Sequence, residues 1–130
     1  MSGRSMRVVR LFGPGDLRLV REPVPRPGRG ELLVRVEGCG LCPTDVRRYR
    51  TGPSPGSGPV TLGHEWVGRV IELGPGTSGW ERGDRVYGDT FAGFAEFAVI
   101  ATAPSEESHG AFRVPEQLPL ERAVFIEPVA

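Results

Sequence analysis

Glycine and proline occur so often along this chain that little room is left for long helices. Together the 19 Gly and 13 Pro make up about a quarter of the 130 residues, and they are scattered along the whole length. Both residues disfavour helix interiors, whereas glycine permits tight turns. Between them the sequence alternates: in residues 31–37, Leu32, Val34 and Val36 fall on one face of an extended segment. This period of two predicts short strands with one buried face.

The same pattern recurs and predicts a mainly β domain, built as a small barrel or sandwich. We expect strands at residues 6–12, 16–21, 31–37, 66–73, 84–87 and 94–100. A short helix is predicted at 44–50, with Thr44 or Asp45 as its N-cap. A longer one is predicted at 120–130, after the boundary that Leu118-Pro119 sets. Residues 51–59, rich in Gly and Pro, predict an irregular loop.

The composition places the chain in the ordinary globular class and predicts one domain over residues 1–130. Sixteen basic and sixteen acidic residues cancel, which argues against a nucleic-acid partner. No apolar run approaches the roughly 20 residues that span a bilayer, and the N-terminus has no apolar core of a signal peptide. We therefore expect no membrane partner and a cytoplasmic location, where Cys39 and Cys42 are thiols or metal ligands rather than a disulfide.

Two short motifs carry candidate chemistry. Cys42 is a potential zinc ligand, although a free cysteine is also commonly a small buried apolar residue. The Cys39-x-x-Cys42 spacing lacks the second cysteine pair of a structural zinc site. His64 and Glu65 follow a glycine and precede an apolar strand, so they are either metal ligands or a polar strand start. The other histidine, His109, lies in a polar loop and is predicted to be solvated.

Five blocks of the sequence resemble, in order, the N-terminal GroES-like catalytic domain of the zinc-dependent medium-chain alcohol and polyol dehydrogenases. They lie at 31–50, 60–73, 83–88, 93–100 and 113–130, and include GCGLCPTD, LGHEWVGRVIELG and FIEPVA. The Glu-Pro near the end is similar to the sorbitol, glucose and threonine dehydrogenase branch. The resemblance implies a mainly β fold: a GroES-like small β-barrel with short helices and one C-terminal helix.

The resemblance also implies a zinc site. Cys42 and His64 resemble two ligands of the catalytic zinc, and Glu65 resembles the carboxylate beside them, which either ligates the metal or stands behind it. Glu127 resembles the carboxylate that completes the site in the polyol branch. A zinc ion in such a site lowers the pKa of a bound alcohol and polarises a carbonyl. The alternative is a metal-free descendant in which these side chains are polar pocket residues.

Catalytic roles follow from the same resemblance. Thr44 resembles the hydroxyl that relays the alcohol proton, Asp45 resembles the acid that orients the zinc histidine, and Glu65 is the third candidate catalytic residue. Arg47 stands where many members have a histidine that passes the proton to solvent, so the outer end of that relay is altered. The aromatic residues nearby, Phe91 among them, are either pocket walls or core.

The Gly-x-Gly-x-x-Gly spacing occurs once, at residues 74–79, but no helix is predicted to follow it, so it does not predict a dinucleotide-binding phosphate loop. The family binds NAD(P) on a Rossmann domain, and here the sequence ends at Ala130, where that domain would begin. We expect no cofactor-binding domain in this chain, and NAD(P) only if a separate Rossmann domain supplies it. The four-cysteine structural zinc lobe is also absent, and residues 89–93 bridge its place.

Three functions are compatible with these observations. In the preferred reading, the chain is a freestanding GroES-like domain repurposed for biosynthetic, non-redox chemistry on an apolar small molecule, such as cyclisation, elimination or isomerisation. In the alternative, it is the catalytic half of a split or truncated zinc-dependent dehydrogenase. In a further alternative, it is a non-enzymatic binding module. An open cleft would expose an apolar face, so we expect a homodimer or a partner that covers the missing Rossmann face.

Overall fold

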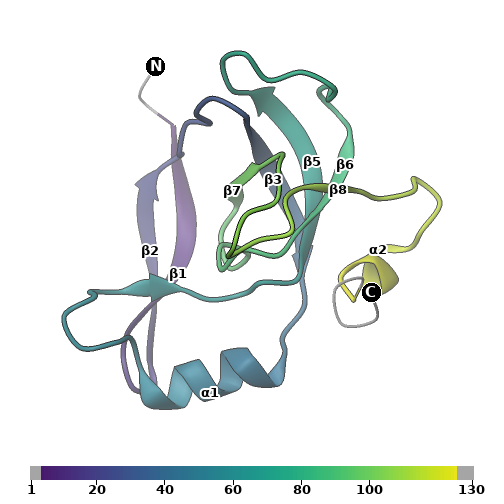
Figure 1. The fold of residues 1–130 in the computed structure, drawn as a ribbon. Helices are drawn as coiled ribbons and strands as arrows, with labels where there is room; N and C mark the ends of the chain where they lie inside the picture. The colour runs from purple at the N-terminus through teal and green to yellow at the C-terminus, as the bar shows by residue number, and fades with distance from the viewer. Residues whose placement is uncertain (1–3, 126–130) are drawn as a thin grey trace.

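The computed structural model describes residues 4–125, which form two antiparallel sheets and two short helices (Figure 1). The smaller sheet contains β1 (Ser5–Gly13), β2 (Asp16–Pro23) and β4 (Val60–Thr61), in the order β2-β1-β4. β1 and β2 form a hairpin across Pro14 and Gly15, where Gly15 adopts a positive φ of 68° that suits a tight turn. The two predicted N-terminal strands are therefore confirmed as one hairpin.

The larger sheet contains five strands in the order β7-β3-β5-β6-β8. Their bounds are Glu31–Cys39 for β3, Trp66–Leu73 for β5, Arg85–Gly88 for β6, Phe97–Ala101 for β7 and Phe112–Arg113 for β8. The predicted GroES-like, mainly β class is confirmed. The strands of residues 4–125 form two open sheets, however, and not a barrel closed by hydrogen bonds.

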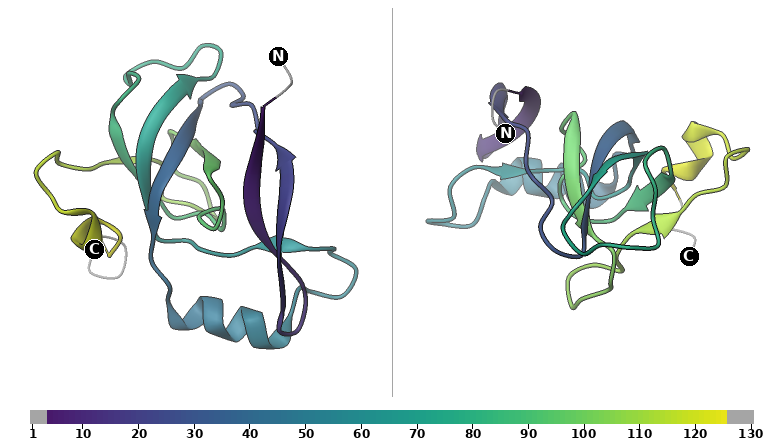
Figure 2. Two further views of the ribbon diagram at one scale, coloured as in Figure 1. Left: turned by 180° about the vertical axis from the view of Figure 1, so that it is seen from behind. Right: turned by 90° about the horizontal axis from the view of Figure 1, so that it is seen from above.

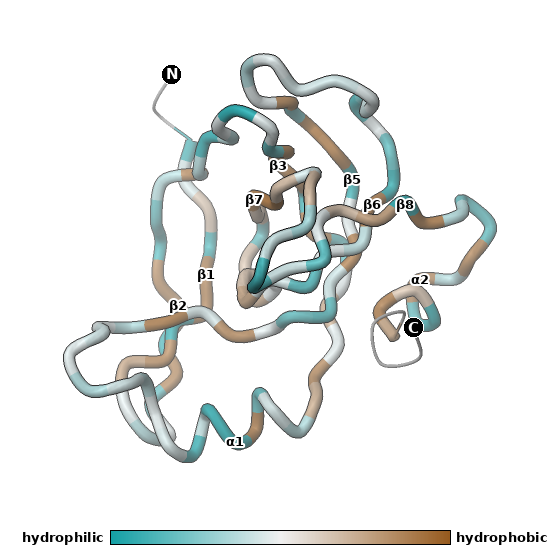
Figure 3. The backbone as a smooth tube through the Cα atoms, viewed as in Figure 1, coloured by the Kyte–Doolittle hydropathy of each residue, from teal (hydrophilic) through white to brown (hydrophobic). Residues whose placement is uncertain are grey.

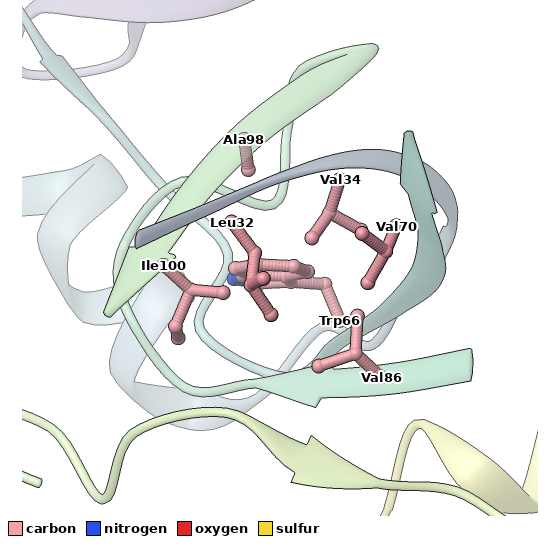
Figure 4. Packing of buried hydrophobic residues seen from close by; sticks show 7 residues of the cluster. All are labelled: Leu32, Val34, Trp66, Val70, Val86, Ala98 and Ile100. Carbon is pink, nitrogen blue, oxygen red and sulfur yellow. The ribbon is translucent and has the colours of Figure 1, made fainter. Parts of the chain in front are cut away.

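The core lies on the inner face of the larger sheet and is built around Trp66 (Figure 4). Leu32 and Val34 of β3 pack there, as the alternating pattern predicts, and Leu33 on the opposite face is buried as well. The remaining members of the cluster are Val70, Val86, Ala98 and Ile100. The Trp66 indole N–H donates to the carbonyl oxygen of Thr90 at 2.9 Å, so its polar atom is satisfied inside the core. Figure 3 shows the hydrophobic residues that gather along these strands.

Helix α1 (Pro43–Thr51) lies at one end of the β1–β2 hairpin in all three ribbon views (Figures 1 and 2). The backbone N–H of Gly15 donates to the carbonyl of Tyr49 at 2.7 Å and fixes the hairpin turn against the helix. The predicted helix is confirmed, but the predicted cap is wrong. Cys42 is the N-cap and Pro43 takes the first helical position, where a missing N–H costs nothing.

Helix α2 (Leu120–Ala123) begins directly after Pro119, as predicted, and ends at Ala123, so the expected longer helix is not found in the described residues. It packs on a second apolar cluster that includes Val67, Tyr87 and Val114. The buried Arg85 of β6 donates to the carbonyl oxygens of Pro115 and Leu118, which fixes the segment that leads into the helix.

Two further differences from the sequence-based expectation concern strands. β7 begins at Phe97, because residues 94–96 contact β1 and β3 through irregular backbone hydrogen bonds and the isolated Val8–Ala95 bridge. β4 and β8, each two residues long, were not predicted.

Within residues 4–125, no helix has the length and apolar character needed to cross a membrane.

Candidate metal centre

Three candidate ligands from two segments converge on one point. Cys42, His64 and Glu65 each offer a metal-binding atom, and these atoms lie within 4.8 Å of one another. The Cys42 Sγ is 2.8 Å from the His64 Nε2, and the Glu65 Oε2 is 4.0 Å from the same nitrogen. The structure therefore brings together three of the four metal ligands that the sequence predicts. The fourth, Glu127, lies outside the described residues.

The local fold explains why these segments meet. Cys42 follows β3 and caps α1, whereas His64 and Glu65 immediately precede β5. β3 and β5 are paired antiparallel, with Cys39 opposite Trp66. The segment that follows β3 and the segment that precedes β5 are therefore adjacent. The backbone N–H of Gly40 donates to the carbonyl of Glu65 at 2.7 Å and extends the pairing to the site. The donors are thus held by the central strands of the sheet.

Asp45 connects the two ligand segments from inside the protein. Its side chain is buried, and the whole residue is 1% exposed. One carboxylate oxygen accepts the backbone N–H of Cys42 at 3.1 Å, and the other accepts the backbone N–H of Gly63 at 3.0 Å. Hydrogen bonds of this kind are roughly twice as strong as neutral ones because the acceptor is charged. The carboxylate therefore holds the backbone next to both Cys42 and His64.

Cys39 does not belong to the cluster, although it is only three residues from Cys42. It packs between the backbones of Gly63 and Gly93, which leave no space for a side chain of their own. Burial raises the pKa of the Cys39 thiol to about 12, so it remains protonated at neutral pH. Both cysteines are free, as predicted, and the Cys-x-x-Cys spacing therefore contributes one candidate ligand and one packed thiol.

A cavity of about 370 Å³ opens over the three donors. Thr44 lines it from the first turn of α1, and Leu41, Pro43 and Phe125 supply apolar walls. A larger cavity of about 730 Å³ lies between β2, the segment that follows it and β3. None of the three donors lines that larger cavity, and we therefore assign the candidate chemistry to the smaller one.

An aromatic ring and a guanidinium group flank the histidine. The Phe91 ring centroid is 4.9 Å from the His64 ring centroid, with 40° between the ring planes. The Arg48 guanidinium lies over the other ring, and its Cζ is 4.4 Å from the Phe91 ring centroid. The sequence-based reasoning named Phe91 only as a pocket wall or core residue and missed Arg48. The position four residues after Thr44 on a predicted helix was the available signal.

The remaining candidates lie away from the cluster or make other contacts. His109 is exposed, with 69% of its side chain accessible, and its Nδ1 lies 2.7 Å from an oxygen of Asp89. Its predicted exposure to solvent is confirmed. Arg47 is exposed on α1, and Trp66 is core rather than pocket wall.

The donor set fits zinc. Proteins bind zinc through thiolate, imidazole and carboxylate groups, and catalytic sites use three such groups and keep one position for water or substrate. Here the three donors are one of each kind, and they border a cavity that a small molecule can enter. Glu65 is 3% exposed, and a buried carboxylate needs a positive partner or hydrogen bonds.

Known proteins share both the sequence pattern and the fold. The family model "Alcohol dehydrogenase GroES-like domain" matches residues 28–111. The sorbitol dehydrogenase of Halalkalibacterium halodurans is 40% identical over 78 residues, which are 60% of this chain and 22% of that protein. The structure of 2R,3R-butanediol dehydrogenase from Bacillus subtilis superposes with a TM-score of 0.83 at 25% identity, over 96% of this chain and 45% of that one.

A third comparison includes a metal. The cobalt and zinc bound thermostable alcohol dehydrogenase from Pyrobaculum aerophilum is 28% identical, with a TM-score of 0.78 over 95% of this chain and 45% of that one. The 130 residues thus span less than half the length of each of these three relatives.

Proposed function

Because the chain belongs to the alcohol dehydrogenase GroES-like domain family, we propose that it binds zinc through Cys42, His64 and Glu65 and acts on the oxygen of an alcohol or carbonyl substrate. One observation carries this proposal. A thiol, an imidazole and a carboxylate from two separate segments meet within 4.8 Å at the floor of a cavity. The zinc named for the Pyrobaculum aerophilum relative supports the choice of metal.

When bound, zinc supplies Lewis-acid chemistry that polarises a carbonyl or lowers the pKa of an alcohol. The chain's own residues bind and orient the substrate. The Thr44 hydroxyl lines the cavity and can both donate and accept a hydrogen bond, which suits it to exchange the proton of the substrate hydroxyl. Leu41, Pro43 and Phe125 exclude water from one side, so the substrate carries an apolar portion next to its reacting oxygen.

Two reaction classes share this substrate activation. In a dehydrogenase, hydride leaves the alcohol carbon for a nicotinamide and the hydroxyl proton leaves through Thr44. Gly74, Gly76 and Gly79 have the spacing of a phosphate loop, but they lead from β5 into β6 and open no helix, so a nicotinamide would be held by residues outside these 130. In a non-redox reaction, the polarised carbonyl undergoes cyclisation, elimination or isomerisation and needs no hydride carrier. The dehydrogenase names of the relatives support the first class, and the non-redox preference drawn from the sequence gains no further support.

Metal analysis of matched variants tests the proposal. We expect purified protein to hold about one zinc ion per chain, Cys42→Ser and His64→Ala to lose it, and Cys39→Ser to keep it. Circular dichroism establishes that each variant is folded. Zinc-free wild-type protein, or equal zinc in wild type and Cys42→Ser, would contradict the proposal. Titration with NADH, followed by its fluorescence, adds a one-sided test of the reaction class: binding by this chain alone would favour the dehydrogenase.

A further inference from the structure

We propose that Arg48 binds an anionic group of the substrate, a carboxylate or a phosphate, while the reacting oxygen lies at the Cys42–His64–Glu65 cluster. This inference rests on the proposed function, because it presumes a substrate in the cavity above that cluster. It adds the substrate class: hydroxy or keto compounds that carry a negative charge about one helical turn from the reacting oxygen. The argument depends on the position of Arg48, on its lack of an ion-pair partner within residues 4–125, and on its contact with Phe91.

Two successive contacts, Arg48 with Phe91 and Phe91 with His64, place the positive charge beside the cluster. The Arg48 Cζ is 4.4 Å from the Phe91 ring centroid, which is 4.9 Å from the His64 centroid, so the guanidinium carbon is at most 9.3 Å from the imidazole centre, the sum of the two. That distance is within the roughly 10 Å over which charges interact at 0.1 M salt. A substrate of a few carbon atoms can therefore reach both groups.

The helix register places Arg48 on the face of α1 that carries Thr44, although Arg48 does not itself line the cavity. Thr44 lines the cavity, and Arg48 follows it by four residues on α1. Residues four apart on a helix lie on the same face, with their Cβ atoms roughly 5–6 Å apart. The guanidinium group thus stands one turn beyond the hydroxyl that faces the reacting oxygen. Arg50, six residues after Thr44, falls on a different face of the same helix.

No acidic side chain of the described residues neutralises this helix. Arg47, Arg48 and Arg50 form no ion pair within residues 4–125, whereas Arg10, for comparison, is paired with Glu22. The one acid on the helix, Asp45, accepts backbone N–H groups with both of its carboxylate oxygens. Helix α1, next to the cavity, therefore carries positive charge that no acid of residues 4–125 pairs with, and such charge attracts anions.

Arg48 lies over the Phe91 ring without using a hydrogen bond. A guanidinium group that lies over an aromatic ring uses its planar face, and its N–H groups point outward along the edge. None of the Arg48 side-chain N–H groups donates a hydrogen bond to another described residue. Such an edge matches carboxylate and phosphate oxygens in a bidentate manner. Phe91 thus serves to hold Arg48 in place and to keep the group at a fixed distance from His64.

Binding to the cobalt-loaded full chain tests the inference without an activity assay. The absorption of Co²⁺ reports on the cluster, and the probes are glycerol, glycerate and glycerol 3-phosphate. We expect at least one anion to bind wild type roughly tenfold more tightly than glycerol, the factor of one charge-assisted hydrogen bond. In Arg48→Gln the preference should fall to within about twofold, while Arg50→Gln, the matched control on another face, should keep it. The tighter of the two anions identifies carboxylate or phosphate as the preferred group.

The outcomes separate this inference from the proposed function. If Co²⁺ does not bind at Cys42 and His64, the proposed function itself fails. If Co²⁺ binds but glycerol and both anions bind equally, or if Arg48→Gln keeps the full anion preference, only the inference is overturned. The inference is also overturned if Arg50→Gln loses as much of the anion preference as Arg48→Gln does. Should Arg48→Gln not fold, Arg48→Lys replaces it, because lysine keeps the charge but lacks the planar edge. An unchanged preference for the anions over glycerol in Arg48→Lys would overturn the bidentate role given to Arg48.

Discussion

The carboxylate of Asp45 accepts the backbone N–H of Gly63 at 3.0 Å, although the two residues belong to different segments of the chain. Its second oxygen accepts the N–H of Cys42. A single buried side chain therefore sets the distance between the segment that carries Cys42 and the segment that carries His64. The spacing of the thiol and the imidazole depends on this connection as much as on the pairing of β3 with β5.

Replacement of Asp45 by Asn should weaken both the fold and the metal site. The asparagine amide has one oxygen for the two backbone N–H donors, and its NH₂ group faces the second donor. We therefore expect a loss of roughly 2–4 kcal/mol in the free energy of unfolding. Zinc affinity should fall about 10- to 100-fold because the ligands lose their support. Urea denaturation and chelator competition measure the two effects. Asp16→Asn, at an exposed turn, is the control, and zinc affinity within twofold of wild type in Asp45→Asn would refute the role.

The two cysteines should differ sharply in reactivity in metal-free protein. The thiolate is the species that reacts, and burial raises the pKa of Cys39 to about 12. At pH 8 roughly one Cys39 side chain in ten thousand is then ionised. Iodoacetamide should therefore label Cys42 first, and Cys39 labelling should rise as the pH is raised toward 12 while the protein stays folded. Peptide mass spectrometry resolves the two sites, and equal labelling rates at pH 8 would contradict the burial of Cys39.

Gly63 should not tolerate a side chain. Its φ is +90°, and a Cβ there would lie 2.6 Å from a ring carbon of Phe94 and 2.7 Å from the Cys39 Sγ. Gly56, with φ +79°, has open space around the same position. Backbone strain alone costs about 1–2 kcal/mol, so we expect about that loss in Gly56→Ala and a further loss of about 1–3 kcal/mol from overpacking in Gly63→Ala. Thermal unfolding of the pair measures the difference, and equal losses would show that the close contacts relax freely.

Asp89 should contribute stability that is lost in acid. Partial burial is the largest single influence and raises its pKa, but hydrogen bonds from Ser108 and from the backbone and ring of His109 together outweigh it and hold the pKa below the usual range. A carboxyl whose pKa is lower in the folded state stabilises the fold above its unfolded pKa and ceases to do so as the pH falls through the folded value. The stability difference between wild type and Asp89→Asn should therefore shrink as the pH falls from about 5 to 3. Urea denaturation at several pH values checks this, and a constant difference would count against it.

Local patterns were sufficient to predict the larger strands. The alternation in residues 31–37 and 66–73 identifies two neighbouring strands because alternate apolar side chains of each pack into one core, although Leu33 and Val67 on the other faces are buried as well. The short β4 could not be found in this way. It exists because Thr61 and Val60 pair with Arg10 and Leu11 of β1, which are distant in sequence, and two residues carry no period of their own.

The candidate site likewise combines residues that the sequence identifies with contacts that only the structure shows. Cys42, His64 and Glu65 are identified by their types and by the family resemblance, and the structure brings them together. The cap of α1 was misplaced because Asp45 looks like an N-cap in sequence, yet it lies three residues inside and reaches back to Cys42. The contact between Arg48 and Phe91 joins residues far apart in the chain, so no local sequence pattern predicts it.

The loop between α1 and β4 leaves the body of the protein at the C-terminal end of the helix and returns to it at β4, beside β1 (Figure 1). Since Asp45 already fixes the segments on both sides of this loop, the intervening residues have no part in setting the ligand spacing. A Cβ added at Gly56 or Gly58 would meet no atom within 4 Å, and lengthening a flexible loop costs little entropy. The loop is therefore a permissive insertion point, where a fluorescent reporter or an affinity tag could be added without disturbing the spacing of Cys42 and His64.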